Sequence, residues 1–446
     1  MTDTERLKCR SKSLYSLIRH SKPKITISLV GQKGGVTTPY TTGDRIEGTA
    51  VILVDYDTPF NEIEISFKGE ARVLVERRAC PGTSGAGYRF LNIRQSVEHF
   101  EDLRNCVLKA GHPYEFTFLF MVPERLSPHI CQHQFRNCHI GKYHAMLPPT
   151  IGKQPCNEDE NRSSEDMTLE MTKVFYTIEV RILDKCPTSN PQIRILANSI
   201  KVIRVVPTVQ EDATLDLADQ TYFCARKENK VKRNFLQPSI GRMVASCAQP
   251  KAIQLLISNS EGKERVASIA TLKLEFHPAG DEKPPDLHSI VCKLRISTFY
   301  SVFPWQDFPY RFGTLPLSRA GQGLKTSVLP VCKMRVATQQ WQKHSKPSND
   351  DRFEFSLCSD NPSASLAGAT YYTAAIVIPL RLPNSKSFVP TFHSCLISRT
   401  YSLDMSLSYN SPGMSIHASS ISLNVPIQMT TRRNATQLPS LFSHFD

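Results

Sequence analysis

The sequence lacks the motifs that mark most enzyme active sites. It contains no H-E-x-x-H, no G-x-S-x-G, no Walker loop and no protein-kinase signature, each of which encodes a specific catalytic or phosphate-binding geometry. The glycine-rich stretch at residues 80–87 has neither the Lys-Ser/Thr ending of a phosphate-binding loop nor a helical pattern after it. We therefore expect a protein that is not an enzyme and that binds no nucleotide there.

Long apolar runs and paired cysteines are missing as well. No stretch approaches the roughly 18–20 apolar residues that a membrane-spanning helix needs. The 13 cysteines are scattered along the chain without a single C-x-x-C pair, so their spacing encodes neither a disulfide framework nor a zinc ribbon. Reduced thiols in a cytosolic protein are the simpler interpretation.

Helical periodicity is also missing. Apolar and polar residues alternate along the chain instead. Residues 174–182, 401–409 and 421–427 carry apolar side chains at every second position, which predicts strands with one buried face. Residues 62–68 alternate in the same way, with the charged side chains expected on a face exposed to water. Many short strands separated by Gly and Pro turns predict an all-β fold.

The length of 446 residues favours two domains, because a single core stops growing at roughly 250–300 residues. Residues 208–237 have little alternation and change from acidic to basic, as a connector does. The predicted organisation is a basic flexible tail at 1–22, a first β-sandwich at 23–207, a linker at 208–237, a second β-sandwich at 238–430 and a tail at 431–446.

The formal charge of +13 favours anionic partners such as acidic or phosphorylated peptides, or an anionic membrane surface. Basic side chains at the ends of sandwich strands can converge on one phosphate or carboxylate. The candidate cargo- or phosphate-binding residues are Lys22, Lys24, Arg72, Arg77 and Arg78. Nucleic acid is not the expected partner, because the aromatic side chains follow the buried period of the strands.

The segment from 112 to 152 is the most distinctive part of the chain. Residues 114–122 are apolar on both faces, which predicts a strand in the middle of a packed sheet. Pro123 ends that strand, and a crossing then leads to the prolines at 148 and 149.

The crossing contains six possible metal ligands. Their spacings, H-x-C-x-H and C-H-x4-H, match no closed structural zinc site. Partly buried, hydrogen-bonded side chains are therefore the favoured interpretation, with no metal and no cofactor. The candidate donors considered are His129, Cys131, His133, Cys138, His139 and His144.

Taken together, the motifs resemble those of the alpha-arrestin family, in its fungal form. The motifs are Y-x-x-G-D-x-I-x-G at 40–48, I-x-I-x-F-x-G at 63–69, F-x-F-x-F-x-V-P at 116–123 and L-P-P-T-x-G at 147–152, with closing strands at 401–427. The resemblance covers nearly the whole chain. The motif residues to which it assigns a structural role are Tyr40, Gly43, Asp44, Gly48, Phe118, Pro123, Leu147, Pro148, Pro149 and Gly152.

This resemblance implies two immunoglobulin-like β-sandwich domains in tandem. It also implies a cytoplasmic adaptor, peripheral to the plasma membrane or endosomes, that binds the cytoplasmic tails of transporters or receptors. Many members of the family recruit a HECT-type ubiquitin ligase through P-P-x-Y peptides, which leads to endocytosis of the cargo. The segments 148–151, 284–287 and 308–310 each depart from P-P-x-Y, so direct recruitment of a ligase is not predicted.

Two other classes of function are left open. The missing P-P-x-Y motif also fits an arrestin-fold structural subunit of an endosomal sorting complex. A basic β-sandwich that binds nucleic acid is suggested by the net charge alone.

Overall fold

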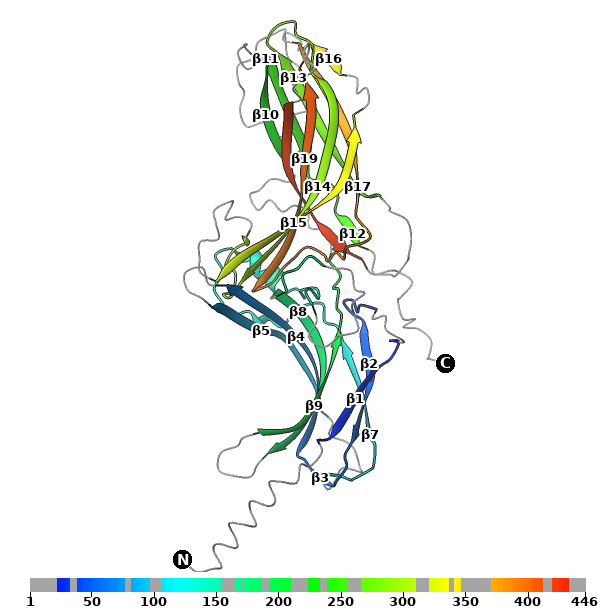
Figure 1. Ribbon diagram of the computed structural model, residues 1–446. Helices are drawn as coiled ribbons and strands as arrows, with labels where there is room; N and C mark the ends of the chain where they lie inside the picture. Colours follow the sequence, from blue (N-terminus) through cyan, green and yellow to red (C-terminus); the bar gives the residue numbers. More distant parts are fainter. Residues whose placement is uncertain are drawn as a thin grey trace, which may run out of the picture.

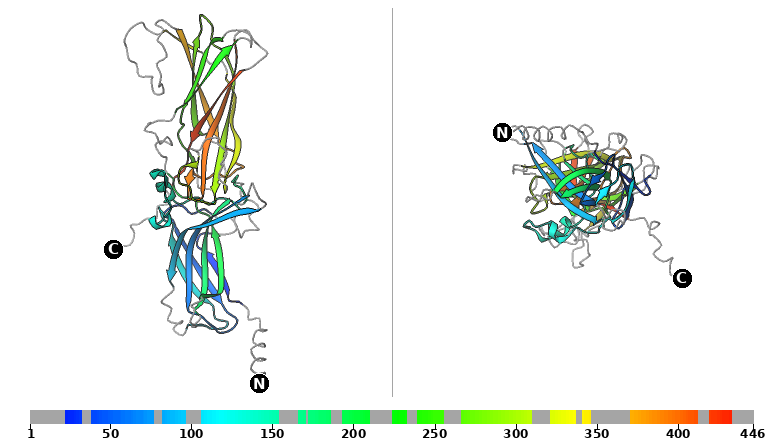
Figure 2. Two further views of the ribbon diagram at one scale, coloured as in Figure 1. Left: turned by 90° about the vertical axis from the view of Figure 1, so that its left-hand side faces the viewer. Right: turned by 90° about the horizontal axis from the view of Figure 1, so that it is seen from below.

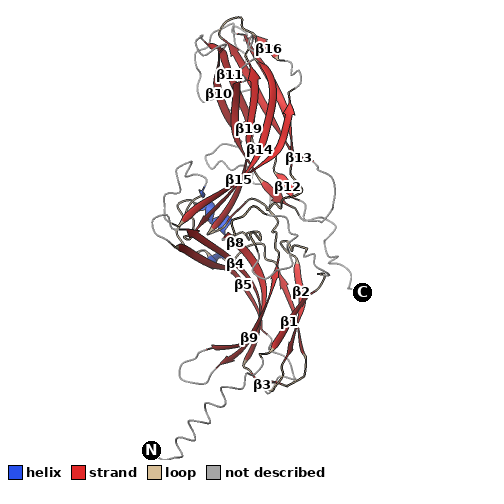
Figure 3. Ribbon diagram, viewed as in Figure 1, coloured by secondary structure: helices blue, strands red, loops and turns tan. Residues whose placement is uncertain are grey.

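Strands make up most of the described structure. The computed structural model describes residues 22–32, 38–76, 82–96, 106–153, 166–170, 172–185, 193–209, 224–232, 239–255, 266–309, 321–336, 341–345, 370–411 and 419–432. These ranges contain one α-helix, α2 (Cys138–His144), and one short 3-10 helix, η2 (Pro128–Ile130), as Figure 3 shows. The expected all-β class is confirmed. No helix within these ranges is long and apolar enough to cross a membrane.

The first half of the chain builds two main sheets. One has three strands in the order β1-β2-β7, and the other has four in the order β5-β4-β8-β9. The strands of the first sheet are β1 (Lys24–Leu29), β2 (Arg45–Leu53) and β7 (Tyr114–Met121). Those of the second are β4 (Glu62–Glu76), β5 (Thr83–Ser96), β8 (Thr172–Lys185) and β9 (Ile193–Ile203). The short strands β3 (Thr58–Pro59) and β6 (Val107–Leu108) pair beside them.

Strand β7 is an edge strand, which corrects the prediction that it lies in the middle of a sheet. Its side chains alternate between buried and exposed, and Leu119 and Met121 are more than half exposed. The free edge is covered by a side chain instead of a strand. Leu119 N donates to Gln95 Oε1 (3.1 Å), and Gln95 Nε2 donates to Thr117 O (3.3 Å). An amide side chain here replaces part of a missing neighbour.

Strand β4 corrects a second expectation, that of a polar face exposed to water. Glu64, Ser66 and Lys68 are all buried, because β4 is a central strand between β5 and β8. Lys68 forms an ion pair with Glu179 of β8. Glu64 accepts from Arg181 at 3.3 Å. Charged residues on this face satisfy one another across the strands, which is what permits their burial.

The second half builds two larger sheets. One follows the order β10-β11-β13-β17-β16, and the other follows β15-β14-β19-β18, with β20 also pairing with β19. The first sheet contains β10 (Cys224–Lys232), β11 (Ser239–Ala248), β13 (Val266–Pro278), β16 (Gln342–Ser345) and β17 (Thr370–Arg381). The second contains β14 (Asp286–Ser301), β15 (Gln322–Arg335), β18 (Phe392–His393), β19 (Ile397–Asn410) and β20 (Ser419–Ile427). Strand β12 (Ile253–Leu255) pairs in parallel with β21 (Met429–Thr431).

The alternation predicted for the last strands is confirmed. Tyr401, Leu403 and Met405 are buried on one face of β19, while the residues between them are partly exposed. Part of the predicted linker differs from the expectation. Residues 224–232 form β10, an edge strand paired with β11. Most of its side chains are charged and point outward, and Val231 is the one fully buried there, so no alternation is visible in the sequence.

Each half has its own hydrophobic core, and the two cores exchange residues where they meet. Phe392, Leu396 and Ile397, from the second half, pack into the core of the first half. Met167, from the first half, packs into the core of the second. Figures 1 and 2 show the two stacks of sheets end to end, with α2 at the level where they join. The join is therefore a packed junction rather than a flexible tether.

Candidate metal centre

The His- and Cys-containing crossing lies in the junction between the two halves. Pro123 follows β7, η2 comes next, and α2 begins after Asn137. The side chain of Asn137 accepts from His139 N (3.0 Å), which caps the helix. The hydroxyl of Tyr88 on β5 donates to Ile130 O and holds the start of the crossing against the four-stranded sheet. These contacts set the path of the chain through residues 130–144.

The second half of the chain supplies the other side of the junction. Ile140 of α2 is fully buried against Trp305 and Phe308. Trp305 binds the segment before β19 twice, with its Nε1 donating to Leu396 O (3.2 Å) and its N donating to Cys395 O (2.9 Å). Cys395 is therefore presented to the crossing by a fixed backbone.

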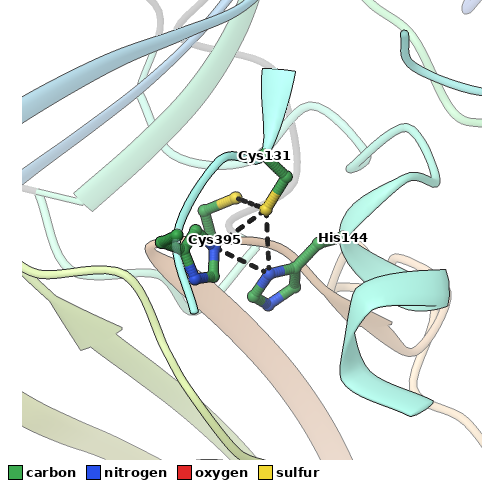
Figure 4. Close-up of side chains that lie close together, drawn as sticks. Cys131, His144 and Cys395 are labelled. Atoms are coloured by element: carbon green, nitrogen blue, oxygen red, sulfur yellow. Dashed lines mark hydrogen bonds between the residues drawn. The ribbon is translucent and has the colours of Figure 1, made fainter. Parts of the chain in front are cut away.

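Four potential ligands converge at this point. The Sγ of Cys131 lies 2.8 Å from His133 Nε2, 3.5 Å from His144 Nδ1 and 3.3 Å from Cys395 Sγ. His144 Nδ1 and His133 Nε2 are 3.3 Å apart. All four donor atoms lie within 4.8 Å of one another. Figure 4 shows Cys131, His144 and Cys395 pointing toward a common centre.

Three of these four separations lie in the range of a tetrahedral zinc site, and the 2.8 Å between Cys131 Sγ and His133 Nε2 is shorter. Zinc binds sulfur at about 2.3 Å and imidazole nitrogen at about 2.0–2.1 Å, which places neighbouring donors about 3.3–3.8 Å apart. Two thiols and two imidazoles form one of the standard donor sets for structural zinc. The 3.3 Å between the two sulfurs is much longer than the roughly 2.05 Å of a disulfide bond.

The cluster is largely closed to solvent. His144 and Cys395 are buried, and Cys131 and His133 are partly buried. The ring of Phe135 lies edge-on to both imidazoles, with its centroid 4.6 Å from that of His133 and 5.7 Å from that of His144. An aromatic side chain thus covers the outer side of the donor set, a feature typical of closed sites.

The two thiols of the cluster differ in proton affinity. The hydrogen bond with Cys395 and, to a smaller extent, the contact with His144 together lower the pKa of Cys131 to about 5. The same bond, together with burial, raises the pKa of Cys395. Burial lowers the pKa of His144, which keeps that imidazole neutral. The lowered pKa of Cys131 favours its thiolate, which is the form that binds a metal ion.

The structure brings together only some of the donors that the crossing contains. Cys131, His133 and His144 meet, whereas His129, Cys138 and His139 are exposed and lie outside the cluster. The fourth donor, Cys395, was missed. It is 264 residues away from Cys131, and no spacing rule reaches across such a distance.

The candidate basic residues are not brought together in the same way. Lys22 and Lys24 are exposed at the start of β1. Arg72 lies in the far half of β4, where it donates to Glu70 Oε2 (3.0 Å) and stacks over the ring of Phe175 at 4.9 Å. Arg77 and Arg78 lie outside the described residues. The described members of this set therefore form no single anion site.

The motif residues of the first half occupy turns and strand crossings around its core. Gly43 has φ 79° and donates its N–H to Val122 O (2.9 Å), while Asp44 Oδ2 accepts from Thr41 N (2.7 Å). Tyr40 N donates to Arg204 O (2.8 Å), and Pro148 O accepts from the Tyr176 hydroxyl (2.6 Å). Gly48 and Phe118 face one another across β2 and β7. The remaining motif residues in this part of the chain are Pro123, Leu147, Pro149 and Gly152, of which Leu147 and Pro149 are buried.

No protein-family model matches this chain, and no curated protein matches its sequence. The site and the fold are therefore interpreted from their own geometry.

Proposed function

We propose that this chain is a non-enzymatic adaptor of the arrestin type, with two immunoglobulin-like β-sandwiches in tandem. In this proposal it binds cytoplasmic parts of membrane transporters or receptors and promotes their ubiquitin-dependent endocytosis. The observation that carries the proposal is the pair of stacked-sheet units, each with its own core, joined through a packed junction. Such a framework holds two large surfaces in a fixed relation, as simultaneous contact with a cargo and a second partner requires.

The first strand is the surface proposed for cargo. β1 forms one edge of the three-stranded sheet, and an open edge can take up an extended peptide as an added strand. Lys22 and Lys24 are exposed at its beginning, and Thr26 and Ser28 are exposed along it. Two ammonium groups at the start of this edge strand favour an acidic or phosphorylated peptide. The same charges favour an anionic membrane surface behind the cargo.

Contact with a ubiquitin ligase is proposed to be indirect. Pro148 and Pro149 are buried, and so are Pro285 and Pro309. A WW domain needs an exposed, extended proline segment, so these described prolines offer it no ligand. A partner protein would then supply the contact with a HECT-type ligase.

The same burial favours a second candidate function. A structural subunit of an endosomal sorting complex needs a rigid two-module framework and no ligase motif of its own. This candidate predicts a stable complex of fixed stoichiometry, whereas an adaptor binds its cargo reversibly.

Proximity labelling with the full chain, followed by affinity purification, tests the proposal. We expect membrane transporters or receptors and components of the ubiquitin system to be enriched. The charge reversal Lys22→Glu with Lys24→Glu should reduce cargo recovery several-fold. The matched reversal Lys333→Glu with Arg335→Glu, at exposed positions of β15, should leave it unchanged.

Recovery of no membrane protein and no ubiquitin component would overturn the adaptor proposal. Purification of a stoichiometric complex that survives size-exclusion chromatography would favour the sorting subunit. Equal loss of cargo in both double variants would mean that net charge, and not the edge of β1, determines binding.

A further inference from the structure

The four converging ligands come from both halves of the molecule. Cys131, His133 and His144 belong to the crossing after β7, whereas Cys395 belongs to the segment between β18 and β19. The elements that carry them are already in contact, since Ile140 of α2 packs against Trp305, and Trp305 binds the backbone at 395 and 396. The cluster therefore lies at the point where the two halves touch.

Two thiols and two imidazoles in direct contact are an unusual group of side chains in a protein interior. Two sulfurs lie 3.3 Å apart, two imidazole nitrogens lie 3.3 Å apart, and all four donor atoms lie within 4.8 Å of one another. Buried polar atoms are normally satisfied by separate partners. Here they are directed at one another, and a single divalent cation at the centre would satisfy all four at once.

We propose that Cys131, His133, His144 and Cys395 bind one Zn²⁺ ion in a closed tetrahedral site, and that this ion fastens the two halves of the molecule together. Two thiolates and two neutral imidazoles match the ligand preference of zinc. The protein fills all four positions, so the ion has no open position for a substrate water and its role is structural. Metal binding requires both thiols to be deprotonated, and the protons that they carry are released to solvent.

A single ion at this site would have a large effect on the stability of the protein, because two of its ligands are far apart in the sequence. The bond between Cys131 and Cys395 through the metal closes a loop of 264 residues. Cross-links that close long loops remove the most freedom from the unfolded chain. The ion would also hold α2 against Trp305 and Phe308, since His144 is the last residue of that helix.

Metal analysis of the purified full-length chain, kept under reducing conditions with no metal added, tests the site. We expect one zinc per chain by elemental analysis and by native mass spectrometry. Cys395→Ser and His144→Asn should each abolish stoichiometric zinc. Cys138→Ser and His139→Asn should retain it, since these positions carry the same residue types on the same helix and are exposed.

Cobalt substitution keeps the test decisive if a ligand variant fails to fold. Wild-type protein stripped of metal by a chelator should bind one Co²⁺ with the intense visible absorption of a tetrahedral thiolate site. Hydrogen exchange at residues 299–308 and 392–397 should rise on stripping and fall again when Zn²⁺ is restored.

Several results would overturn the proposal. One is a folded wild-type chain that binds no stoichiometric metal and gives no cobalt spectrum. Another is a loss of zinc in Cys138→Ser equal to the loss in the ligand variants. A third is an intact mass two units lower that maps to a Cys131–Cys395 disulfide. The measurement uses purified protein and does not depend on the adaptor proposal. Absence of zinc leaves cargo binding to be judged by proximity labelling, and absence of cargo leaves the metal result standing.

Discussion

At the scale of single residues, Arg399 connects the two halves of the chain through a single side chain. It is completely buried at the start of β19 and donates to three oxygens: Thr298 Oγ1 (3.0 Å), Asp166 O (2.8 Å) and Thr168 Oγ1 (2.6 Å). Two of these acceptors belong to the first half of the chain and one to the second. A guanidinium group suits this task, because its donors diverge in one plane.

Replacing Arg399 by Met is expected to lower the free energy of unfolding by about 2–4 kcal/mol, because the buried oxygens lose a charged donor. Urea denaturation followed by circular dichroism measures the change. Arg89→Met is the control. Arg89 is half exposed and paired with Glu70, and such a surface pair contributes about 0–1 kcal/mol. Equal losses in the two variants would contradict the role given to Arg399.

Met167 shows how one residue can be placed against its local preference. It has φ 58°, a conformation that side chains other than glycine seldom adopt. Its neighbour Asp166 holds the turn, with its carboxylate accepting from Gly152 N (2.6 Å) and Thr168 N (3.0 Å). The result is that Met167 points into the core of the second half while its neighbours bind Arg399. Tertiary contacts therefore offset a local conformational cost.

At the scale of elements, the three-stranded sheet depends on one close approach. Gly48 of β2 lies opposite Leu29 of β1 and Phe118 of β7. A Cβ atom there would lie 2.3 Å from Ser28 O and 2.5 Å from the ring of Phe118. Only glycine lets the Phe118 ring lie across the strand at this position.

Gly48→Ala is expected to destabilise the protein by about 1–3 kcal/mol, because either the ring or the strand β1 has to move. Gly87→Ala is the matched control. Gly87 also lies in a strand, β5, and a Cβ there meets no atom within 4 Å. The control should be neutral or slightly stabilising, by up to about 1 kcal/mol. A control as unstable as Gly48→Ala would show that loss of strand glycine, and not the close approach, is responsible.

Two edge strands are protected in different ways against pairing with other chains. The outer side of β7 is closed by Gln95 from β5, a single side chain that bonds to both Thr117 and Leu119. Strand β10 protects an edge differently, with exposed charged side chains along most of its length. Both devices discourage unwanted pairing with other chains. The edge of β1 is the one for which we propose a partner.

At the scale of the whole molecule, the junction determines whether the two halves unfold together. It combines reciprocal core residues, the Arg399 hydrogen bonds and the four-ligand cluster. A junction that combines these contacts favours cooperative unfolding of the two halves.

Removal of the proposed zinc ion by a chelator is expected to lower the melting temperature by about 3–6 °C, since a long-loop cross-link contributes a few kcal/mol to the stability of this long chain. Differential scanning calorimetry should also show the single transition broaden or divide as the halves uncouple. The Cys395→Ser variant should be insensitive to the same chelator. An identical shift in that variant would mean that the chelator acts elsewhere.

The sequence was sufficient for the strand content and for most strand positions. Alternation predicted β8, β19 and β20. The sequence also predicts a strand at 352–358, a stretch that lies outside the described residues. The exposed face expected for β4 was wrong, because Glu64 and Lys68 find charged partners on neighbouring strands that the local pattern does not reveal.

The sequence revealed only part of the candidate metal centre. The crossing showed an excess of His and Cys, but three of its six possible ligands face solvent and the fourth ligand of the cluster comes from the other half. Alternation determines which side of a strand is buried, and that information is local, so the sequence by itself determined an all-β chain. Which edges stay open, which charges pair and which cysteine joins the crossing depend on contacts between distant segments, and only the tertiary structure decided them.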